Sequence, residues 1–369
     1  MIEEKINKIQ PAVRILVAPL DWGLGHATRC IPIINYLQNA GFEVVLAGEG
    51  DNVKIFGKAQ PKSVILPLKG YRVKYSRNKG LFFLKMLIQI PKIIFAINHE
   101  KNWLKKVVVS HKIDAVISDN RFGLSHPGIP TVFISHQLAI KTGNPWLDVF
   151  VQKINYHFIN KFNECWIPDF ESANNLAGSL SHPKNLPEIP VSYLGILSRF
   201  KKFSAEKKYD LLILLSGPEP QRSIFEKLLL TQIKNFKGSI AMVRGLPATV
   251  MQLTNGNEQL TIYNHLPASG LNELILQSEN IVARCGYSTV MDLVTLQKNA
   301  ILVPTPGQTE QEYLAAYLME KKIFFTCKQE NFSLKKSMES AGVFNFKQTE
   351  IEAGMQEAVI NKWLQQVRK

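Results

Sequence analysis

The chain has 369 residues, 46% of them apolar and 20% charged, and its formal net charge at pH 7 is +14. This composition excludes a disordered, fibrous or collagen-like protein, and the length predicts two domains, because one hydrophobic core rarely organises so many residues. Four scattered cysteines without a metal-binding or disulfide-like spacing indicate a reducing compartment, and the polar first ten residues do not resemble a secretion signal, so we expect a cytoplasmic protein.

Short apolar runs alternate with helical patterns through the first half of the chain. Near-continuous apolar strands joined by helices indicate a parallel sheet that is covered on both faces. The first helix is expected at residues 26–39. Strands are predicted at residues 13–18, 43–47, 63–66, 115–118, 131–134, 164–167 and 192–195.

A glycine-containing loop follows the first predicted strand and opens the first helix. Gly23 and Gly25 would let the backbone turn tightly and let a ligand approach it closely. His26 is a candidate general base, since imidazole titrates near neutral pH. The alternative is a histidine that only helps to cap its helix. The loop does not match the dinucleotide-binding fingerprint, because its Gly-x-Gly is followed by His-Ala-Thr.

Two later strands of this half also end in polar side chains. Asp119 follows the strand at 115–118 and could accept a hydrogen bond from His26, which would orient the imidazole ring. The alternative is that Asp119 caps a turn or pairs with Arg121. His136 follows the strand at 131–134, and we expect it to bind an acceptor rather than to act in catalysis.

The segment from Lys69 to Lys112 concentrates the positive charge, with 11 basic residues and one acidic residue. Within it, residues 81–97 are apolar except for a narrow stripe at helical spacing, formed by Lys85, Gln89, Lys92 and Ala96. This run is too short and too charged to cross a bilayer comfortably. It could pack into the domain or lie on an anionic membrane surface. Nucleic acid is a third possibility, although few aromatic residues are interleaved with the basic ones.

A polar, basic stretch at 198–208 has little to bury and predicts a linker. The alternation then restarts, with strands expected at 210–215, 239–243, 260–263, 281–283, 300–303 and 323–326. We therefore predict a first domain at 1–197, a linker at 198–209 and a second domain at 210–348. Residues 349–369 would form a last helix that could pack back on the first domain.

The order strand, glycine turn, helix recurs in the second half. Free N–H groups at helix starts can bind anions, and ligands of such sheets lie beyond the carboxyl ends of the strands. The cleft should therefore take a ligand that is part phosphate and part polyhydroxyl. Arg244, just after the strand at 239–243, could contact the nucleotide base or a phosphate; the alternative is that it forms a surface salt bridge. No Walker lysine motif, zinc-type cluster or Gly-x-Ser-x-Gly elbow is present. Candidate contacts are Ser216, Gly217, Arg222, Arg244, Gly286, Ser288, Thr289, Asp292, Glu310 and Gln311.

On these residues the chain resembles GT-B glycosyltransferases, and most closely glycosyltransferase family 28. Residues 284–292 correspond to the family's glycine turn, helix and acidic residue, which implies that Asp292 binds the ribose hydroxyls. Residues 304–311 resemble the segment that holds the donor sugar, which implies hexose contacts for Glu310 and Gln311. Residues 216–222 resemble the turn near the diphosphate. The likeness covers residues 210–320 best; the first loop reads Gly-Leu-Gly-His instead of the family's Gly-Gly-His, so the acceptor stays open.

The resemblance implies an α/β protein of two doubly wound, Rossmann-like domains whose parallel sheets face each other across a cleft. It implies the inverting transfer of a hexose, with N-acetylhexosamine favoured, from a UDP-linked donor to an acceptor hydroxyl that could be lipid-linked. No metal or cofactor is expected. His26 would act as the base with the help of Asp119, and the basic segment at 69–112 could hold the enzyme on the inner face of a membrane, with no nucleic acid as partner. Two alternatives stay open: a UDP-sugar 2-epimerase of the same fold, which uses no acceptor, and a non-catalytic module that binds nucleotides or nucleic acid.

Overall fold

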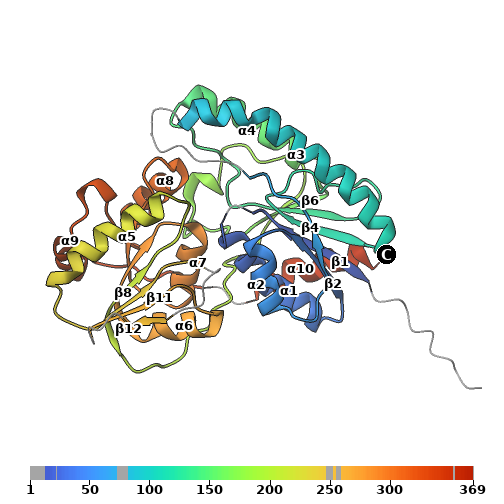
Figure 1. The fold of residues 1–369 in the computed structure, drawn as a ribbon. Coiled ribbons are helices and arrows are strands. Elements are labelled where there is room, and N and C mark those ends of the chain that lie inside the picture. Colours follow the sequence, from blue (N-terminus) through green and yellow to red (C-terminus); the bar gives the residue numbers. More distant parts are fainter. Residues whose placement is uncertain are drawn as a thin grey trace, which may run out of the picture.

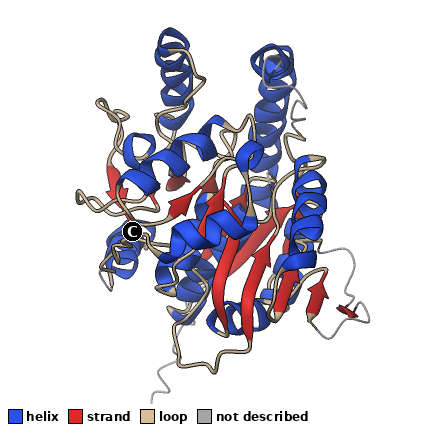
Figure 2. Ribbon diagram, turned by 90° about the vertical axis from the view of Figure 1, so that its left-hand side faces the viewer, coloured by secondary structure: helices blue, strands red, loops and turns tan. Residues whose placement is uncertain are grey.

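A computed structural model describes residues 13–21, 23–72, 82–246, 252–254, 259–351 and 354–368. In this part of the chain, two seven-stranded sheets lie in two lobes (Figure 1). Figure 2 shows helices on both faces of the sheet strands. The prediction of two doubly wound α/β units is confirmed.

The first sheet has the strand order β3-β2-β1-β4-β5-β6-β7, with all neighbouring pairs parallel. Parallel neighbours require crossover connections, and helices provide most of them. The strands are β1 (Arg14–Pro19), β2 (Glu43–Gly48), β3 (Ile65–Pro67), β4 (Ala115–Asp119), β5 (Thr131–Ile134), β6 (Glu164–Ile167) and β7 (Val191–Tyr193). The helices are α1 (Gly25–Asn39), α2 (Asp51–Ala59), α3 (Phe82–Ser110) and α4 (Pro145–Ile159).

The second sheet has the order β10-β11-β9-β8-β12-β13-β14, and only β10 among the described strands runs antiparallel to its neighbour. The strands are β8 (Tyr209–Leu214), β9 (Ile240–Val243), β10 (Gln252–Thr254), β11 (Leu260–Tyr263), β12 (Ser278–Arg284), β13 (Ile301–Val303) and β14 (Phe325–Thr326). The helices are α5 (Gln221–Gln232), α6 (Ala268–Leu276), α7 (Tyr287–Thr295), α8 (Thr309–Glu320), α9 (Leu334–Gly342) and α10 (Met355–Val367).

Both sheets reverse their strand order at the centre, between β1 and β4 in the first and between β8 and β12 in the second. The strands there are buried apolar runs, as the continuous hydrophobic pattern requires. In open α/β sheets the ligand crevice lies outside the carboxyl ends of the strands at such a reversal. Helices α1 and α7, which follow β1 and β12, therefore begin where a ligand is expected.

The last helix, α10, packs against β7 of the first sheet although it follows the second sheet in the chain. Trp363 of α10 meets Trp166 of β6 edge to face, with ring centroids 5.4 Å apart, and both side chains are buried. The guanidinium of Arg368 lies 5.0 Å from the ring centroid of Phe42. The two aromatic contacts fasten the end of the chain to the first lobe.

The stretch between the two sheets buries more than its polar sequence indicates. Phe200 is buried, and the backbone N–H of Lys201 donates to Asn272 Oδ1 at 2.7 Å. The expectation that this stretch has little to bury is therefore wrong at its start. The reason is that one phenylalanine among the lysines joins the hydrophobic core, and Asn272 of α6 holds the backbone beside it.

Helix α3 is attached to the first sheet through a buried polar cluster around Glu100. Its carboxylate pairs with Arg121 Nη1 at 2.7 Å and accepts hydrogen bonds from the Tyr71 hydroxyl at 2.9 Å and the Gly123 N–H at 3.0 Å. A Cβ atom on Gly123 would lie 2.3 Å from the carbonyl oxygen of Ile97 in α3. This helix can approach the loop after β4 only because residue 123 is glycine.

We expect Gly123→Ala to destabilise the fold by about 1–3 kcal/mol, because the added methyl group forces α3 away from the loop. Urea unfolding followed by circular dichroism measures this change. The matched control is Gly57→Ala in α2, where a Cβ meets nothing within 4 Å. That substitution should instead stabilise by up to about 1 kcal/mol, since alanine is the better helix former. Equal unfolding midpoints for Gly123→Ala and the wild type would contradict this account of α3.

Candidate active site

The amino-terminal ends of α1 and α7 face each other between the two sheets (Figure 1). A Cβ atom on Gly25, the first residue of α1, would lie only 2.6 Å from Ser288 Oγ in α7. Gly23 has a φ of +79°, a conformation that glycine adopts without strain. Gly23 thus serves the predicted tight turn, and Gly25 allows the close approach of Ser288; close approach of a ligand to this loop remains a prediction.

His26 lies beside Asp119, which is fully buried at the end of β4. The imidazole Nδ1 is 2.9 Å from Asp119 Oδ1, so the predicted hydrogen bond is present. Arg121, the alternative partner of Asp119, pairs with Glu100 instead. Within the described residues His26 Nε2 has no hydrogen-bond partner, and 14% of the side chain is exposed. The roles of His26 and Asp119 in catalysis remain predictions.

Arg29 lies next to this pair, and the sequence did not identify it. Its Nε donates to Asp119 Oδ2 at 2.6 Å, and its Nη2 donates to Asp119 Oδ1. Arg29 follows His26 by three positions in α1, so both side chains share one face of the helix. That spacing is the only signal that could have drawn attention to it.

The charges of this cluster determine its protonation. Burial would raise the pKa of Asp119, but the charges of Arg29 and His26 outweigh burial and hold it well below its usual range. Burial lowers the pKa of His26, and the nearby Arg29 lowers it further, against the opposing effect of Asp119. At neutral pH the carboxylate is therefore ionised and the imidazole is neutral, which is the state that can accept a proton.

His136 connects the two lobes. Its ring stacks on Tyr287 with centroids 4.2 Å apart and an interplanar angle of 3°. Its Nδ1 is 3.0 Å from Arg29 Nη1, and its Nε2 is 2.8 Å from Glu310 Oε1 in α8. His136 is buried, and both of its nitrogens have protein partners. Acceptor binding by His136 and hexose binding by Glu310 therefore remain predictions, because here the two side chains bind each other.

The second-lobe side of the cleft contains the half-buried Ser288, Thr289 and Asp292 on one helix, α7, with Gly286 at its start. Ser198 Oγ donates to Asp292 Oδ1 at 2.5 Å. Burial raises the pKa of Asp292 to about 6, although Ser198 and Arg199 oppose this rise. The carboxylate that was predicted to bind ribose thus starts out bound to the segment that joins the sheets.

The turn after β8 exposes Ser216 and Gly217, and Gly217 has a φ of +97°. The two arginines predicted near this turn are already paired. Arg222 forms ion pairs with Glu219 at 2.6 Å and Glu226 at 2.8 Å. Arg244 pairs with the same Glu226 at 2.5 Å and also donates to Asn264. Gln311 accepts a hydrogen bond from the Thr305 N–H at 2.9 Å, so it supports the neighbouring loop. Ligand binding by these three side chains remains a prediction.

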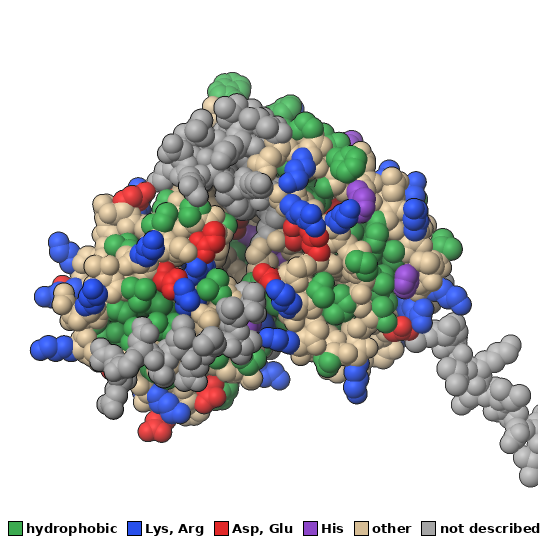
Figure 3. All heavy atoms as spheres, viewed as in Figure 1, with side chains coloured by type: hydrophobic (Ala, Val, Ile, Leu, Met, Phe, Trp, Pro, Cys, Tyr) green, Lys and Arg blue, Asp and Glu red, His purple; other side chains and the backbone are tan. Residues whose placement is uncertain are grey.

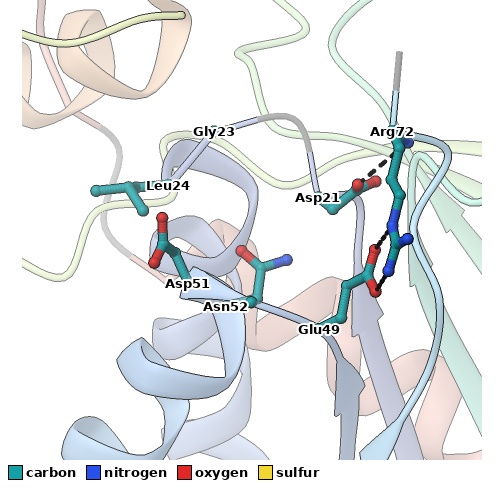
Figure 4. Close-up of a pocket in the computed structure, with 8 residues that line it drawn as sticks. Asp21, Gly23, Leu24, Glu49, Asp51, Asn52 and Arg72 are labelled. Atoms are coloured by element: carbon teal, nitrogen blue, oxygen red, sulfur yellow. Dashed lines mark hydrogen bonds and ion pairs between the residues drawn. The ribbon is translucent and has the colours of Figure 1, made fainter. Parts of the chain in front are cut away.

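A cavity of about 450 Å³ opens beside the loop that precedes α1 (Figure 4). Glu49 and Arg72 form an ion pair at 2.5 Å on its wall, and Asp21 accepts a hydrogen bond from the Tyr71 N–H. Sequence reasoning assigned none of these residues, since three separate loops bring them together. Carboxylate and amide oxygens accept hydrogen bonds from hydroxyl groups, and the negative charge of the carboxylates repels phosphate. The lining residues are Asp21, Gly23, Leu24, Glu49, Gly50, Asp51, Asn52 and Arg72.

Among the described residues, no group of three or more His, Cys, Asp or Glu side chains could hold a metal ion. Metal-independent chemistry remains an expectation from the sequence.

Comparisons with known proteins agree with this arrangement. The model of the glycosyltransferase family 28 C-terminal domain matches residues 240–359. An uncharacterized glycosyltransferase of Methanosarcina acetivorans is 20% identical over 338 residues, which cover 84% of each chain. The UDP-N-acetylglucosamine–N-acetylmuramyl-(pentapeptide) pyrophosphoryl-undecaprenol N-acetylglucosamine transferase of Pasteurella multocida is 21% identical over 309 residues, covering 80% of this chain and 79% of that protein.

Solved structures share the fold. The glycotransferase of kitacinnamycin superposes with a TM-score of 0.62 at 12% identity and covers 97% of this chain and 96% of its own. MurG of Acinetobacter baumannii gives a TM-score of 0.55 at 14% identity, covering 96% of this chain and 100% of its own. Both matches extend over the two lobes together.

Proposed function

We propose that this chain, a glycosyltransferase of the GT-B fold similar to family 28, moves an N-acetylhexosamine from a UDP-linked donor to a hydroxyl group of a lipid-linked acceptor. The observation that carries the proposal is the position of His26. It is a neutral imidazole with an unpartnered Nε2 among the described residues, at the helix end that faces the family 28 segment of α7.

In the proposed step, Nε2 of His26 takes the proton of the acceptor hydroxyl while its oxygen attacks the anomeric carbon. The bond from that carbon to the diphosphate breaks, and the leaving diphosphate keeps the electron pair, so the configuration at the sugar inverts. We assign the stabilisation of the leaving group to backbone N–H groups at the start of α7 and in the turn at Ser216. This assignment needs no metal ion.

On the donor side, Asp292 would bind the ribose hydroxyls once it exchanges its bond to Ser198 for bonds to the nucleotide. The hexose would lie near Glu310 and Gln311. We choose UDP and an N-acetylhexosamine because the Pasteurella multocida relative is a UDP-N-acetylglucosamine-dependent transferase. On the acceptor side, the cavity beside Asp21 and Glu49 would bind hydroxyl groups of the acceptor.

We further propose that the enzyme works at the cytoplasmic face of a membrane through an apolar and basic surface on α3 and α4. None of the helices in the described residues combines the length and the apolar character that crossing a bilayer would need. Phe95 of α3 is 75% exposed and Trp146 of α4 is 87% exposed, and Val149, Phe150 and Ile154 follow on the same face of α4. Lys92 and Lys153 are exposed on the same helices. Figure 3 shows hydrophobic and basic side chains intermingled on this lobe.

The predicted polar stripe on α3 falls only partly within the described residues. Helix α3 begins at Phe82, and the side chain of Lys85 lies outside the described residues, while Lys92 donates to the carbonyl of Arg72 at 2.6 Å. The buried side of the same helix contains Ile97 and Glu100. The helix therefore packs on the domain along one side and leaves Phe95 exposed on the other. This arrangement supports packing into the domain and contact with a membrane surface together.

We expect the protein to sediment with vesicles that contain anionic lipid and much less with neutral vesicles, because the positive charges of Lys92 and Lys153 are attracted to anionic lipid. Phe95→Ser and Trp146→Ser should each weaken this binding by about tenfold, given the apolar area that each ring buries. The matched control is Val343→Ser, which removes an 88% exposed side chain on the second lobe. Unchanged vesicle binding in the double variant would contradict the membrane surface.

The activity itself is tested by incubating the protein with UDP-N-acetylglucosamine, with and without a bacterial lipid extract as the source of acceptor. Release of UDP and labelling of lipid that both depend on the extract support transfer. Formation of the 2-epimer without any acceptor would instead support the epimerase. Absence of both products across UDP-, GDP- and dTDP-linked sugars would overturn the proposed function.

A further inference from the structure

We propose that Arg29 is a positioning residue for the base: it fixes which nitrogen of His26 carries the proton, and it ties this arrangement to the second lobe. The inference rests on the proposed function only in calling His26 the general base. Its geometry involves neither donor nor acceptor, so it can be tested separately.

The first step concerns Asp119, which Arg29 holds from two sides. Arg29 Nε donates to Oδ2 at 2.6 Å and Nη2 donates to Oδ1, so the plane of the carboxylate is fixed. Both side chains are almost completely buried. The Oδ1 atom then faces Nδ1 of His26 at 2.9 Å and can only accept a hydrogen bond. This leaves the proton of neutral His26 on Nδ1 and the lone pair on Nε2.

A competing contact decides how firmly the proton is placed. Arg29 Nη2 also lies 3.0 Å from His26 Nδ1, and a guanidinium can only donate. If Nδ1 accepted that bond, its lone pair would lie against an ionised oxygen of Asp119, which is repulsive. Arg29 Nη2 can donate to Asp119 Oδ1 instead of to Nδ1. The ionised Oδ1 can only accept, so it favours a proton on His26 Nδ1. The arrangement with the proton on Nδ1 is therefore favoured, and it depends on the fork of Arg29.

The second step concerns charge. An ionised carboxylate alone would favour the protonated imidazole, and a base that is already protonated cannot act. Burial lowers the pKa of His26, and the positive charge of Arg29 lowers it further against this effect of Asp119. Among the other groups near His26, burial raises the pKa of the Cys30 thiol, and burial would also raise the pKa of Glu310, but His136, His26 and Arg29 lower it below its ordinary value. The groups that face the pair are Asp119 from β4, Arg29 and Cys30 from α1, His136 after β5 and Glu310 from α8.

The third step links Arg29 to the second lobe. Its Nη1 donates to His136 Nδ1 at 3.0 Å, so His136 carries its proton on Nε2 and donates it to Glu310 at 2.8 Å. The ring of His136 also stacks on Tyr287 of α7. Separation of the lobes would remove the contacts with Glu310 and Tyr287, so the His136 ring that accepts from Nη1 would lose the partners that orient it. Arg29 thus has one end on Asp119 and the other on His136, a first-lobe residue whose contacts with Glu310 and Tyr287 exist only while the lobes are together.

Nuclear magnetic resonance of the full chain with labelled histidines tests the inference without any substrate. The variant His26→Gln identifies the His26 signals among the 8 histidines. We expect wild-type His26 to titrate below the ordinary imidazole range and to carry its proton on Nδ1. In Arg29→Gln its pKa should rise by about 1 unit or more, the usual effect of removing one nearby charge. An unchanged His26 titration in a folded Arg29→Gln protein would overturn the inference.

Arg29→Lys keeps the charge but loses the fork, and it decides the matter if Arg29→Gln does not fold. We expect the population of His26 with the proton on Nδ1 to fall in this variant, and the same tautomer and titration as in the wild type would overturn the inference. The matched control is Arg121→Lys, another fully buried arginine that clamps a carboxylate in the same lobe. It should lower thermal stability without changing His26. Where a donor and acceptor are known, the acidic limb of the kcat/KM profile should move with the measured pKa of His26. A change in the His26 pKa without a change in that limb would leave the positioning role intact and count against the transferase reaction.

Discussion

Replacement of His26 by alanine is expected to lower kcat by about 10²–10⁴-fold, the usual contribution of one well-placed general base. His26 belongs to the first lobe, whereas Asp292 and the turn at Ser216, which are expected to bind the donor, belong to the second. The affinity for the donor should therefore change little. Steady-state rates at saturating donor, together with calorimetry of donor binding, separate the two quantities.

The matched control is His111→Ala. His111 lies just before β4, at the amino edge of the sheet and away from the cleft, and should leave kcat unchanged. Near-normal turnover of His26→Ala would show that another group removes the proton.

The pH dependence of the wild-type enzyme gives an independent view of the same residue. Burial and Arg29 lower the pKa of His26, so the imidazole is protonated only at a pH below its ordinary value of about 6.5. Activity should then stay constant through neutral pH and fall only as the pH drops below this value. A loss of kcat/KM that begins above neutral pH would not fit His26 as the base.

Replacement of Asp292 by asparagine is expected to weaken binding of a UDP-linked sugar by about 10–100-fold. Hydrogen bonds to a charged group are worth about 1.5–3 kcal/mol each, and the ribose hydroxyls would lose such a partner. Asparagine retains the shape and can still accept the bond from Ser198, so the segment that joins the sheets should stay in place. Calorimetric titration measures the affinity, with Glu279→Gln, an exposed carboxylate of the same lobe, as the control.

The same variant should make the ligand-free protein more stable at neutral pH. Burial raises the folded-state pKa of Asp292 to about 6, above the unfolded value of about 4, so the folded protein binds the extra proton between these values. The wild type should lose stability at this site as the pH rises from about 4 to about 6. After allowance for the partial exposure of Asp292, the wild type should lose about 1 kcal/mol of its free energy of unfolding over this pH range. Asp292→Asn should not show this loss. Urea unfolding at several pH values measures this difference. The same pH dependence of the free energy of unfolding in the wild type and in Asp292→Asn would contradict it.

The elements that the sequence predicts best are the buried parallel strands. Strands β5, β6 and β11 have the expected limits. All residues of β5 and β6 are buried, as expected for strands covered on both faces, whereas in β11 only Ile262 is buried. Strand β10 was missed, since Gln252–Thr254 is a short, polar edge strand without a continuous apolar run. Helix α3 could not be assigned to core or surface from its sequence, because apolar residues lie on nearly all of its sides.

The candidate site divides in a similar way. His26 and Asp119 could be paired from the sequence because both follow central strands of one parallel sheet, whose ends meet. The roles of Arg29, Asp21 and Glu49 could not be foreseen, because each depends on which loops and helices come together in three dimensions. Arg222 and Arg244 illustrate the reverse case: a basic residue near a strand end predicts an anion site, yet both share Glu226 within the protein.

The most direct test of the central claim, that the second lobe binds an activated sugar, is calorimetric titration of the wild-type protein with UDP-N-acetylglucosamine. The account predicts saturable heat at one site per chain, competition by UDP, and a strongly reduced affinity in Asp292→Asn. The absence of heat with every UDP-, GDP- and dTDP-linked sugar, or an unchanged affinity in Asp292→Asn, would contradict it.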